Sequence, residues 1–158
     1  MKIEKEEFPK ELITYEKPTK NTKDIKKIIT IVNNEYEEIA VKTAIAWMNA
    51  YNNHDEAGCD EATNFPLIRL GMKGLIIFKK PPLLPPNFFD RFSKATGWNR
   101  TCWEYRQIIH SCETKIHLSL EHTRYRVDGS VIDICPAIWV ITNQNGHWGI
   151  KIRSSFVD

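Results

Sequence analysis

The sequence lacks several features that would assign a protein to a functional class directly. Its 158 residues include 4 cysteines, and no two of these have the CxxC spacing of zinc and redox motifs. No apolar run approaches the roughly 18 residues that span a membrane. The first residues, MKIEKEEF, contain no apolar stretch typical of a secretory signal. We therefore expect a cytoplasmic protein with reduced cysteines, no metal, no cofactor and no membrane contact.

An excess of charge of one sign is also lacking. The chain has 22 Lys and Arg against 20 Asp and Glu, a net charge of +2, which gives no electrostatic reason to expect nucleic acid as a partner. Lysines gather between residues 17 and 27, where they would suit phosphates or anionic lipid, but acidic neighbours dilute them. We expect residues 1–33 to form a partly disordered leader and residues 34–158 to form a single domain. Within the leader, residues 1–22 are expected to be irregular, and the apolar segment 25–32 can be a helix or a strand.

Helical spacing of apolar residues begins after this leader. Steps of three and four from Tyr36 to Ala50 place one apolar stripe on a helix over 34–51, with Asn33 or Asn34 as its N-cap. The asparagine pair that follows can end the helix, because asparagine tolerates the left-handed conformation. This pattern predicts an amphipathic helix packed on a core.

Two shorter helices are expected further along. Asp55 can act as the N-cap of a helix over about 55–62. A third helix, rich in phenylalanine, follows Asn87 as its cap and ends at Gly97. Between them, the proline-rich segment 81–86 is predicted to be a stiff, extended connector.

The second half of the chain alternates strands with turns. Asp128-Gly129 and Asn145-Gly146 are the dipeptides that two-residue type I′ turns require, and apolar or β-branched runs flank both. With the helices, this pattern predicts an α+β fold of about three helices and about six mostly antiparallel strands. The strands are expected at about 65–70, 75–78, 101–111, 114–127, 130–143 and 147–157.

The two turns fix the register of the strands and therefore the face that each side chain occupies. They predict that Arg124 lies opposite Asp133 and that Trp139 lies opposite Ile152, with Arg153 on the outer face. The expected inner face is apolar and comprises Ile116, Leu118, Leu120, Trp139, Ile141, Trp148, Ile150, Ile152 and Phe156.

One end of this inner face becomes polar, where His122, Arg124 and Asp133 come together. An apolar floor with a few convergent polar groups is typical of a small-molecule pocket. His122 supported by Asp133 is a candidate acid/base pair, and Arg124 would suit a carboxylate or carbonyl oxygen. Alternatively, Arg124 and Asp133 form only a cross-strand ion pair. The expected aromatic walls are Trp47, Tyr51, Trp103, Tyr105 and Trp139.

The outer face of the strand over 130–143 carries more apolar side chains than water would tolerate. These are Ile132, Ile134, Ile138 and Val140. A patch of this kind usually contacts a partner. We expect a homodimer through this face, with coverage by the N-terminal segment as the alternative.

The order of these elements resembles the nuclear transport factor 2-like superfamily, which includes SnoaL-like and ketosteroid-isomerase-like proteins. The segments that carry the resemblance are Trp47–Asp55, the helix end Phe92–Trp98 and the last strand, His147–Ser155. The resemblance implies a curved sheet wrapped around the helices into a cone, a pocket inside the cone, and dimerisation through the outer surface.

The resemblance does not extend to the chemistry of the isomerases. Those enzymes use a tyrosine in the first helix and an aspartate after the second. The matching positions here hold Trp47 and Phe65-Pro66. Two functions stay open: a protein that binds a small, partly apolar molecule, with isomerase-, dehydratase- or hydrolase-like acid/base chemistry as an added option, and a non-catalytic dimerisation or interaction module.

Overall fold

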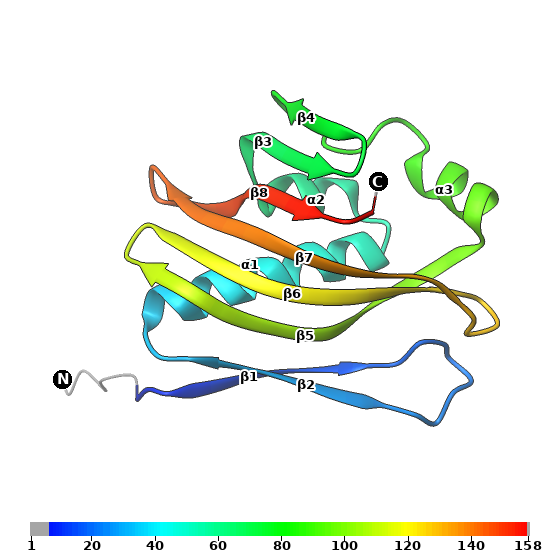
Figure 1. The fold of residues 1–158 in the computed structure, drawn as a ribbon, viewed down its shortest axis with the longest axis horizontal. Helices are drawn as coiled ribbons and strands as arrows, with labels where there is room; N and C mark the ends of the chain where they lie inside the picture. The colour runs from blue at the N-terminus through cyan, green and yellow to red at the C-terminus, as the bar shows by residue number, and fades with distance from the viewer. Residues whose placement is uncertain (1–6, 158) are drawn as a thin grey trace.

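The fold is built around one mixed sheet with helices against one of its faces (Figure 1). The computed structural model describes residues 7–157 of the chain, and within this range there are three helices and eight strands. The helices are α1 (Glu35–Asn52), α2 (Glu56–Glu61) and α3 (Phe88–Thr96). The strands are β1 (Lys10–Glu16), β2 (Lys26–Val32), β3 (Thr63–Gly71), β4 (Gly74–Phe78), β5 (Trp98–Cys112), β6 (Lys115–Arg126), β7 (Val131–Gln144) and β8 (His147–Ser155).

The six-stranded sheet has the order β4-β3-β8-β7-β6-β5, and only β3 and β8 run parallel to each other. Helix α1 packs against β5, β6, β7 and β8. The core between them is formed by Val41, Ala44, Trp47, Met48, Leu118, Leu120, Trp139, Ile141 and Ile150. The predicted α+β class, with a mixed sheet and three helices, is confirmed. No helix within residues 7–157 has the length and apolar character that crossing a membrane requires.

The helix ends confirm some of the predicted caps and correct others. The Asn34 side chain accepts a hydrogen bond of 2.9 Å from the backbone N–H three residues on, as an N-cap does. At the other end Asn53 is the C-cap residue, as predicted, and its N–H bonds to helix carbonyls. Its φ of −91° is not left-handed, and the left-handed residue is the next one, His54 (φ 57°). Asn87 is the N-cap residue of α3, as predicted, but its backbone is left-handed and its side chain makes no capping bond. Gly97 ends α3 at φ 78°, as expected.

Residues 10–32 contain a β-hairpin, where the sequence predicted an irregular leader up to residue 22 and left the segment 25–32 open between helix and strand. Strands β1 and β2 pair with each other and lie alongside β5 (Figure 1). Alternate residues Ile28, Thr30 and Val32 point inward and are buried, while the lysines occupy other positions. The expectation of irregular structure is therefore wrong for β1, and β2 takes the strand alternative. The boundary of the domain at residue 34 remains a prediction.

A buried arginine attaches this hairpin to the sheet. Arg106 on β5 is 1% exposed, and its Nε donates to Thr30 Oγ1 at 3.0 Å. One of its terminal nitrogens donates to Thr14 Oγ1 at 2.9 Å. The hairpin is thus held by hydrogen bonds to a guanidinium group, a feature that its lysine-rich sequence does not reveal.

Strands β6 and β7 pair in the predicted register, although the turn between them is not the predicted two-residue turn. The Arg126 N–H bonds to the Ser130 carbonyl at 2.9 Å, so the loop is longer than a two-residue turn. A bulge at Ile132 then takes up the extra residue, and Arg124 still lies opposite Asp133. The two deviations cancel, and the prediction for the rest of this strand pair is confirmed.

The β7–β8 pair contains a bulge that no second deviation cancels. The register shifts between Val140 and Ile141, so Trp139 lies opposite Arg153 rather than Ile152. The predicted Trp139–Ile152 pair is therefore wrong. Because a shift of one residue reverses the faces, Arg153 turns to the inner face and Ile152 to the outer face.

Strand β5 contains a similar irregularity. A bulge between Trp103 and Tyr105 leaves Trp103 buried and turns Tyr105 to the outer face, where it lies opposite Glu121. Arg106 takes the next inward position, opposite Leu120. Tyr105 is 37% exposed, so the prediction that it lines the inner face is wrong.

Candidate functional site

A cavity of about 460 Å³ lies between the inner face of the sheet and the helices. Helix α1 contributes Trp47 and Tyr51, and α3 contributes Phe88 and Phe92. The proline-rich segment before α3 places Leu83 on the wall as well. A volume of this size lies within the range of small-molecule sites.

The walls of the cavity are aromatic and closely packed. The rings of Trp47 and Tyr51 stack with centroids 5.0 Å apart, because one helical turn separates them on α1. Trp139 meets Trp47 edge-on at 5.4 Å, and Phe88 lies 5.9 Å from Tyr51. Burial raises the pKa of Tyr51 to about 12, so its phenol stays protonated at neutral pH.

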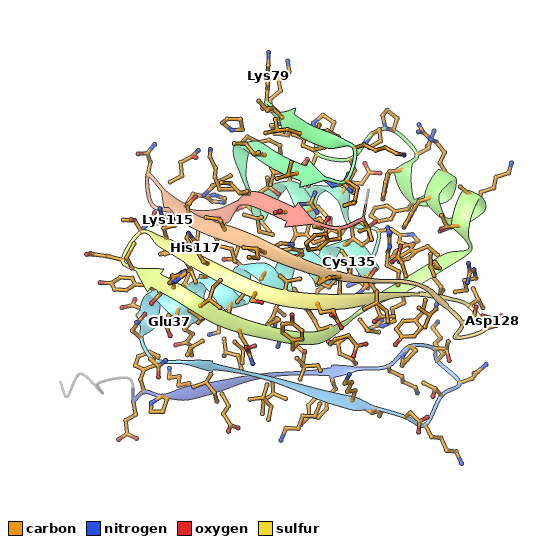
Figure 2. All side chains as sticks on the ribbon, in the orientation of Figure 1. Glu37, Lys79, Lys115, His117, Asp128 and Cys135 are labelled. Carbon is orange, nitrogen blue, oxygen red and sulfur yellow. The ribbon has the colours of Figure 1, made fainter. Side chains whose placement is uncertain are left out.

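His122 lines this cavity as a neutral imidazole. Burial, with the nearby positive charge of Arg124, lowers the pKa of His122 to about 4. Its Nδ1 is buried and has no hydrogen-bond partner. Cys135 lies opposite His122 and also lines the cavity; Figure 2 shows it near the middle of β7.

Asp133 is occupied by Arg124 and not by the histidine. Arg124 Nε donates to one carboxylate oxygen of Asp133 at 2.7 Å, and a terminal nitrogen bonds the other oxygen. The arginine also lies 5.2 Å from the ring of Phe92. Among the hydrogen bonds of residues 7–157, none joins Asp133 to His122. The alternative of a cross-strand ion pair is therefore the arrangement observed, and the proposed acid/base pair is not assembled.

Two further arginines line the cavity side by side. Arg69 and Arg153 are register partners on the parallel strands β3 and β8. Arg153 also lies 4.7 Å from the ring of Trp47, and its Nε is buried without a partner. Burial, with the charge of Arg69, lowers the pKa of Arg153 to about 10, which leaves it positive at neutral pH. Neither forms a salt bridge with an acidic side chain in the part of the chain that the structure describes.

The cavity is consequently electropositive. Among residues 7–157, no Asp or Glu contributes to its lining. The same range contains no cluster of three or more metal-ligating side chains. The wall can offer guanidinium, phenol and indole donors to a bound molecule, together with a neutral imidazole.

The structure brings together most of the predicted site residues. Those that line the cavity are Trp47, Tyr51, His122, Arg124 and Trp139. Trp103 is buried behind Trp139, edge-on at 5.5 Å, and is not part of the lining. Tyr105 lies on the opposite face of the sheet.

Sequence reasoning missed Arg69 and assigned Arg153 to the wrong face. The sequence did contain a signal for Arg69. Residues two apart on a strand share a face, so Arg69 lies on the same face as the apolar Leu67, which is fully buried in the structure. No comparable signal existed for Arg153, since its orientation depends on a bulge in the middle of two long strands.

Comparison with known proteins supports the fold but gives no function. No protein-family model matches the chain, and no curated protein matches it. Among solved structures, an NTF2-like protein from Cytophaga hutchinsonii has a TM-score of 0.59 at 10% identity, covering 79% of this chain and 100% of that one. A protein of unknown function with a cystatin-like fold from Nostoc punctiforme has a TM-score of 0.58 at 13% identity, covering 79% and 93%.

The structure of a provisionally assigned ketosteroid isomerase from Shewanella frigidimarina is about as similar to this chain as those two structures are. It has a TM-score of 0.57 at 12% identity and covers 73% of this chain and 93% of that one. The chain therefore has the nuclear transport factor 2-like, or cystatin-like, fold, as the sequence predicted. Most of these structural neighbours are proteins of unknown function.

Proposed function

We propose that this protein binds a small, planar and partly apolar molecule that carries a carboxylate or a similar compact oxyanion. The observation that carries this proposal is the pair Arg69 and Arg153, which lie side by side on the cavity wall without an acidic partner among residues 7–157. Two like charges in a partly desolvated site repel each other. An anion between them removes that repulsion and accepts charge-assisted hydrogen bonds.

Unpaired donors on the wall support the same conclusion. Trp47 Nε1 and Arg153 Nε are both buried and have no acceptor among residues 7–157. Buried donors are normally paired, and a carboxylate is an acceptor with two oxygens. A ligand with this group would satisfy donors that the chain itself leaves open.

The aromatic residues of the cavity wall indicate the shape of the apolar part of the ligand. Stacked and edge-on rings of Trp47, Tyr51 and Trp139 present flat apolar surfaces, which suit an aromatic or conjugated molecule. His122, neutral and unpartnered at Nδ1, can exchange a hydrogen bond with a second polar group of the ligand. We propose binding as the main activity, because no carboxylate base lines the cavity within residues 7–157.

The test is calorimetric titration with aromatic carboxylates and their neutral amides, beginning with indole-3-acetate and indole-3-acetamide. We expect the carboxylate to bind and the amide to bind at least roughly tenfold more weakly, the value of a hydrogen bond between charged groups. Arg153→Gln should weaken carboxylate binding by a similar factor. Arg91→Gln, at an exposed position of α3, is the matched control. Equal affinity for acid and amide, or no binding by any acid of the panel, would contradict the proposal.

A second proposal concerns the outer face of the sheet. We infer that β7 is the centre of a homodimer interface, because Ile134 and Ile138 are 55% and 44% exposed on a strand flanked by β6 and β8. Ile132 and Val140 on the same strand are half-buried. The N-terminal hairpin lies beyond β5 and leaves these isoleucines exposed (Figure 1). This interface would serve the interaction-module alternative equally well.

A further inference from the structure

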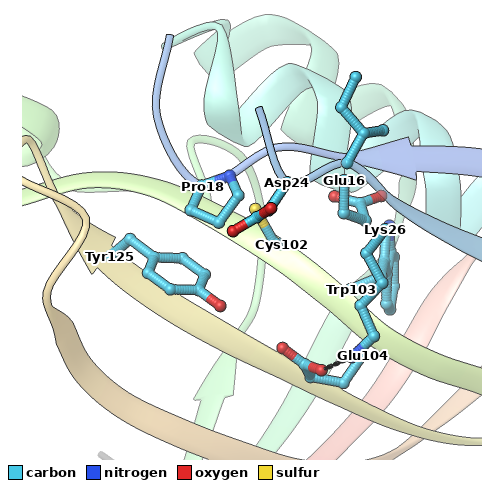
Figure 3. Close-up of a pocket in the computed structure, with 9 residues that line it drawn as sticks. Glu16, Pro18, Asp24, Lys26, Cys102, Trp103, Glu104 and Tyr125 are labelled. Atoms are coloured by element: carbon cyan, nitrogen blue, oxygen red, sulfur yellow. Dashed lines mark hydrogen bonds and ion pairs between the residues drawn. The ribbon is translucent and has the colours of Figure 1, made fainter. Parts of the chain in front are cut away.

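A second pocket, of about 340 Å³, lies between the N-terminal hairpin and strands β5 and β6 (Figure 3). Glu16, Asp24 and Lys26 line it from the hairpin side, and Glu104 and Tyr125 line it from the sheet side. It shares no lining residue with the arginine-lined cavity. The two are separate sites.

The charges of this pocket are opposite in sign to those of the cavity. Three carboxylates face one ammonium group, that of Lys26. Lys26 Nζ bonds to Glu104, which raises the pKa of the lysine, and Thr123 Oγ1 donates to the other oxygen of Glu104 at 2.8 Å. Glu104 is therefore neutralised within the protein. The negative charges of Glu16 and Asp24 remain.

Glu16 is the group that most needs a partner. It is 6% exposed, because the alternation of β1 turns it inward while its neighbour Tyr15 faces solvent. Its backbone belongs to the β1–β2 ladder, but its carboxylate has no hydrogen bond or ion pair with any of residues 7–157. Burial lowers the pKa of Arg106 to about 10, and the charge of Glu16 opposes this shift, so the two groups are near each other. The guanidinium donates its hydrogen bonds to the hairpin threonines and not to Glu16. A carboxylate with so little contact with solvent favours a cation beside it.

The remaining wall is suited to an organic cation. Tyr125 gives the pocket an aromatic wall and Ile25 adds apolar surface, while the ring of Trp103 lies beneath them and is covered by Arg106. Aromatic faces attract ammonium and guanidinium groups and pack against an apolar stem. A metal ion is not favoured, since residues 7–157 contain no cluster of three metal-ligating groups.

We propose that the hairpin pocket binds a small organic cation, a primary ammonium group on an aromatic or aliphatic stem, with Glu16 as its counterion. Asp24 contributes a second negative charge at the solvent side. The ammonium donates hydrogen bonds to the Glu16 carboxylate, and the stem packs against Tyr125 and Ile25. The protein then has two sites of opposite preference, one for an oxyanion and one for an amine.

The test is calorimetric titration of the whole protein with tryptamine and with tryptophol, which carries a hydroxyl in place of the ammonium. We expect tryptamine to bind roughly tenfold more tightly than tryptophol. Glu16→Gln should abolish that preference, and Glu11→Gln, an exposed position on the same strand, should keep it. Asp24→Asn, which is exposed, gives a smaller loss and provides a second variant if Glu16→Gln does not fold.

A further titration shows whether tryptamine binds in the hairpin pocket or in the arginine-lined cavity. Tryptamine should bind to Arg153→Gln as it does to the wild type, because that substitution is in the other cavity. Thermal unfolding of Glu16→Gln and of the wild type confirms that both are folded. The proposal is wrong if tryptamine and tryptophol bind equally, if neither binds, or if Glu16→Gln binds tryptamine with unchanged affinity.

Discussion

Arg153 lies opposite Trp139 across strands β7 and β8, because a bulge after Val140 shifts the register by one residue. The shift places a guanidinium group on the cavity wall where regular pairing would place the side chain of Ile152. It also brings Arg153 next to Arg69 on β3, without an acidic partner among residues 7–157. The positive character of the cavity thus depends on one irregularity of the sheet.

This arrangement predicts that Arg153 lowers the stability of the fold while it strengthens the binding of an anion. We expect Arg153→Met to raise the melting temperature by roughly 2–4 °C, equivalent to about 1 kcal/mol, because it removes a desolvated charge beside a like charge. The same variant should lose affinity for aromatic carboxylates. Scanning calorimetry measures the first effect and titration the second, with Arg91→Met as the control. A lower melting temperature would mean that the contact with Trp47, at 4.7 Å, outweighs the repulsion.

The neutral state of His122 predicts how stability depends on pH. Its pKa falls from 6.5 to about 4 on folding, through burial and the charges of Arg124 and Arg153, with Asp133 opposing them. The unfolded chain therefore binds more protons between these two values, and stability falls as the pH falls through that window. We expect the wild type to lose on the order of 2 kcal/mol more than His122→Gln between about pH 7.5 and about pH 5.

Urea unfolding of both proteins at the two pH values measures this difference. The comparison isolates His122, because every other titrating group is common to wild type and variant. If the two proteins lose the same free energy of unfolding between these pH values, folding does not lower the pKa of His122.

Asn64 connects β3 to the turn between β7 and β8, and we expect this connection to be essential for stability. Its Nδ2 donates to the Thr142 carbonyl at 2.8 Å and to the His147 carbonyl at 2.9 Å, and the side chain is 3% exposed. Asn64→Asp replaces this donor with an oxygen that faces two carbonyl oxygens. A loss of roughly 2–4 kcal/mol in the free energy of unfolding should follow.

Equilibrium unfolding in denaturant measures the loss for Asn64→Asp. Asn99→Asp, at an exposed position, should change the free energy of unfolding by less than about 0.5 kcal/mol. A small loss in both variants would show that water replaces the buried hydrogen bonds of Asn64.

The proposed dimer predicts a specific effect of Ile138→Asp. A carboxylate at the centre of an apolar interface has no partner there, so we expect this variant to be monomeric while the wild type is dimeric. Light scattering during size-exclusion chromatography gives the mass directly. Ile31→Asp, at a position that is 48% exposed on the hairpin, should leave the dimer intact. A monomeric wild type would refute the interface.

Local sequence patterns predicted most of the elements correctly, since they rest on interactions between near neighbours. The Asn34 cap, the turn at Asn145-Gly146 and the Arg124–Asp133 pair are examples. The same patterns located the cavity, because Trp47 and Tyr51 are one helical turn apart and must share a face. They failed for the hairpin, because the lysines between residues 17 and 27 concealed the alternation that buries Ile28 and Val32.

The sequence by itself determined the helices, the turns, the mixed α+β sheet and the aromatic inner face, because short-range spacing decides which side chains share a face. Only the tertiary structure decided the charge of the two pockets. Arg153 reaches the cavity through a bulge in long strands, and Glu16 is buried only because the hairpin packs against β5. Both depend on contacts between residues far apart in the chain, which no local spacing encodes.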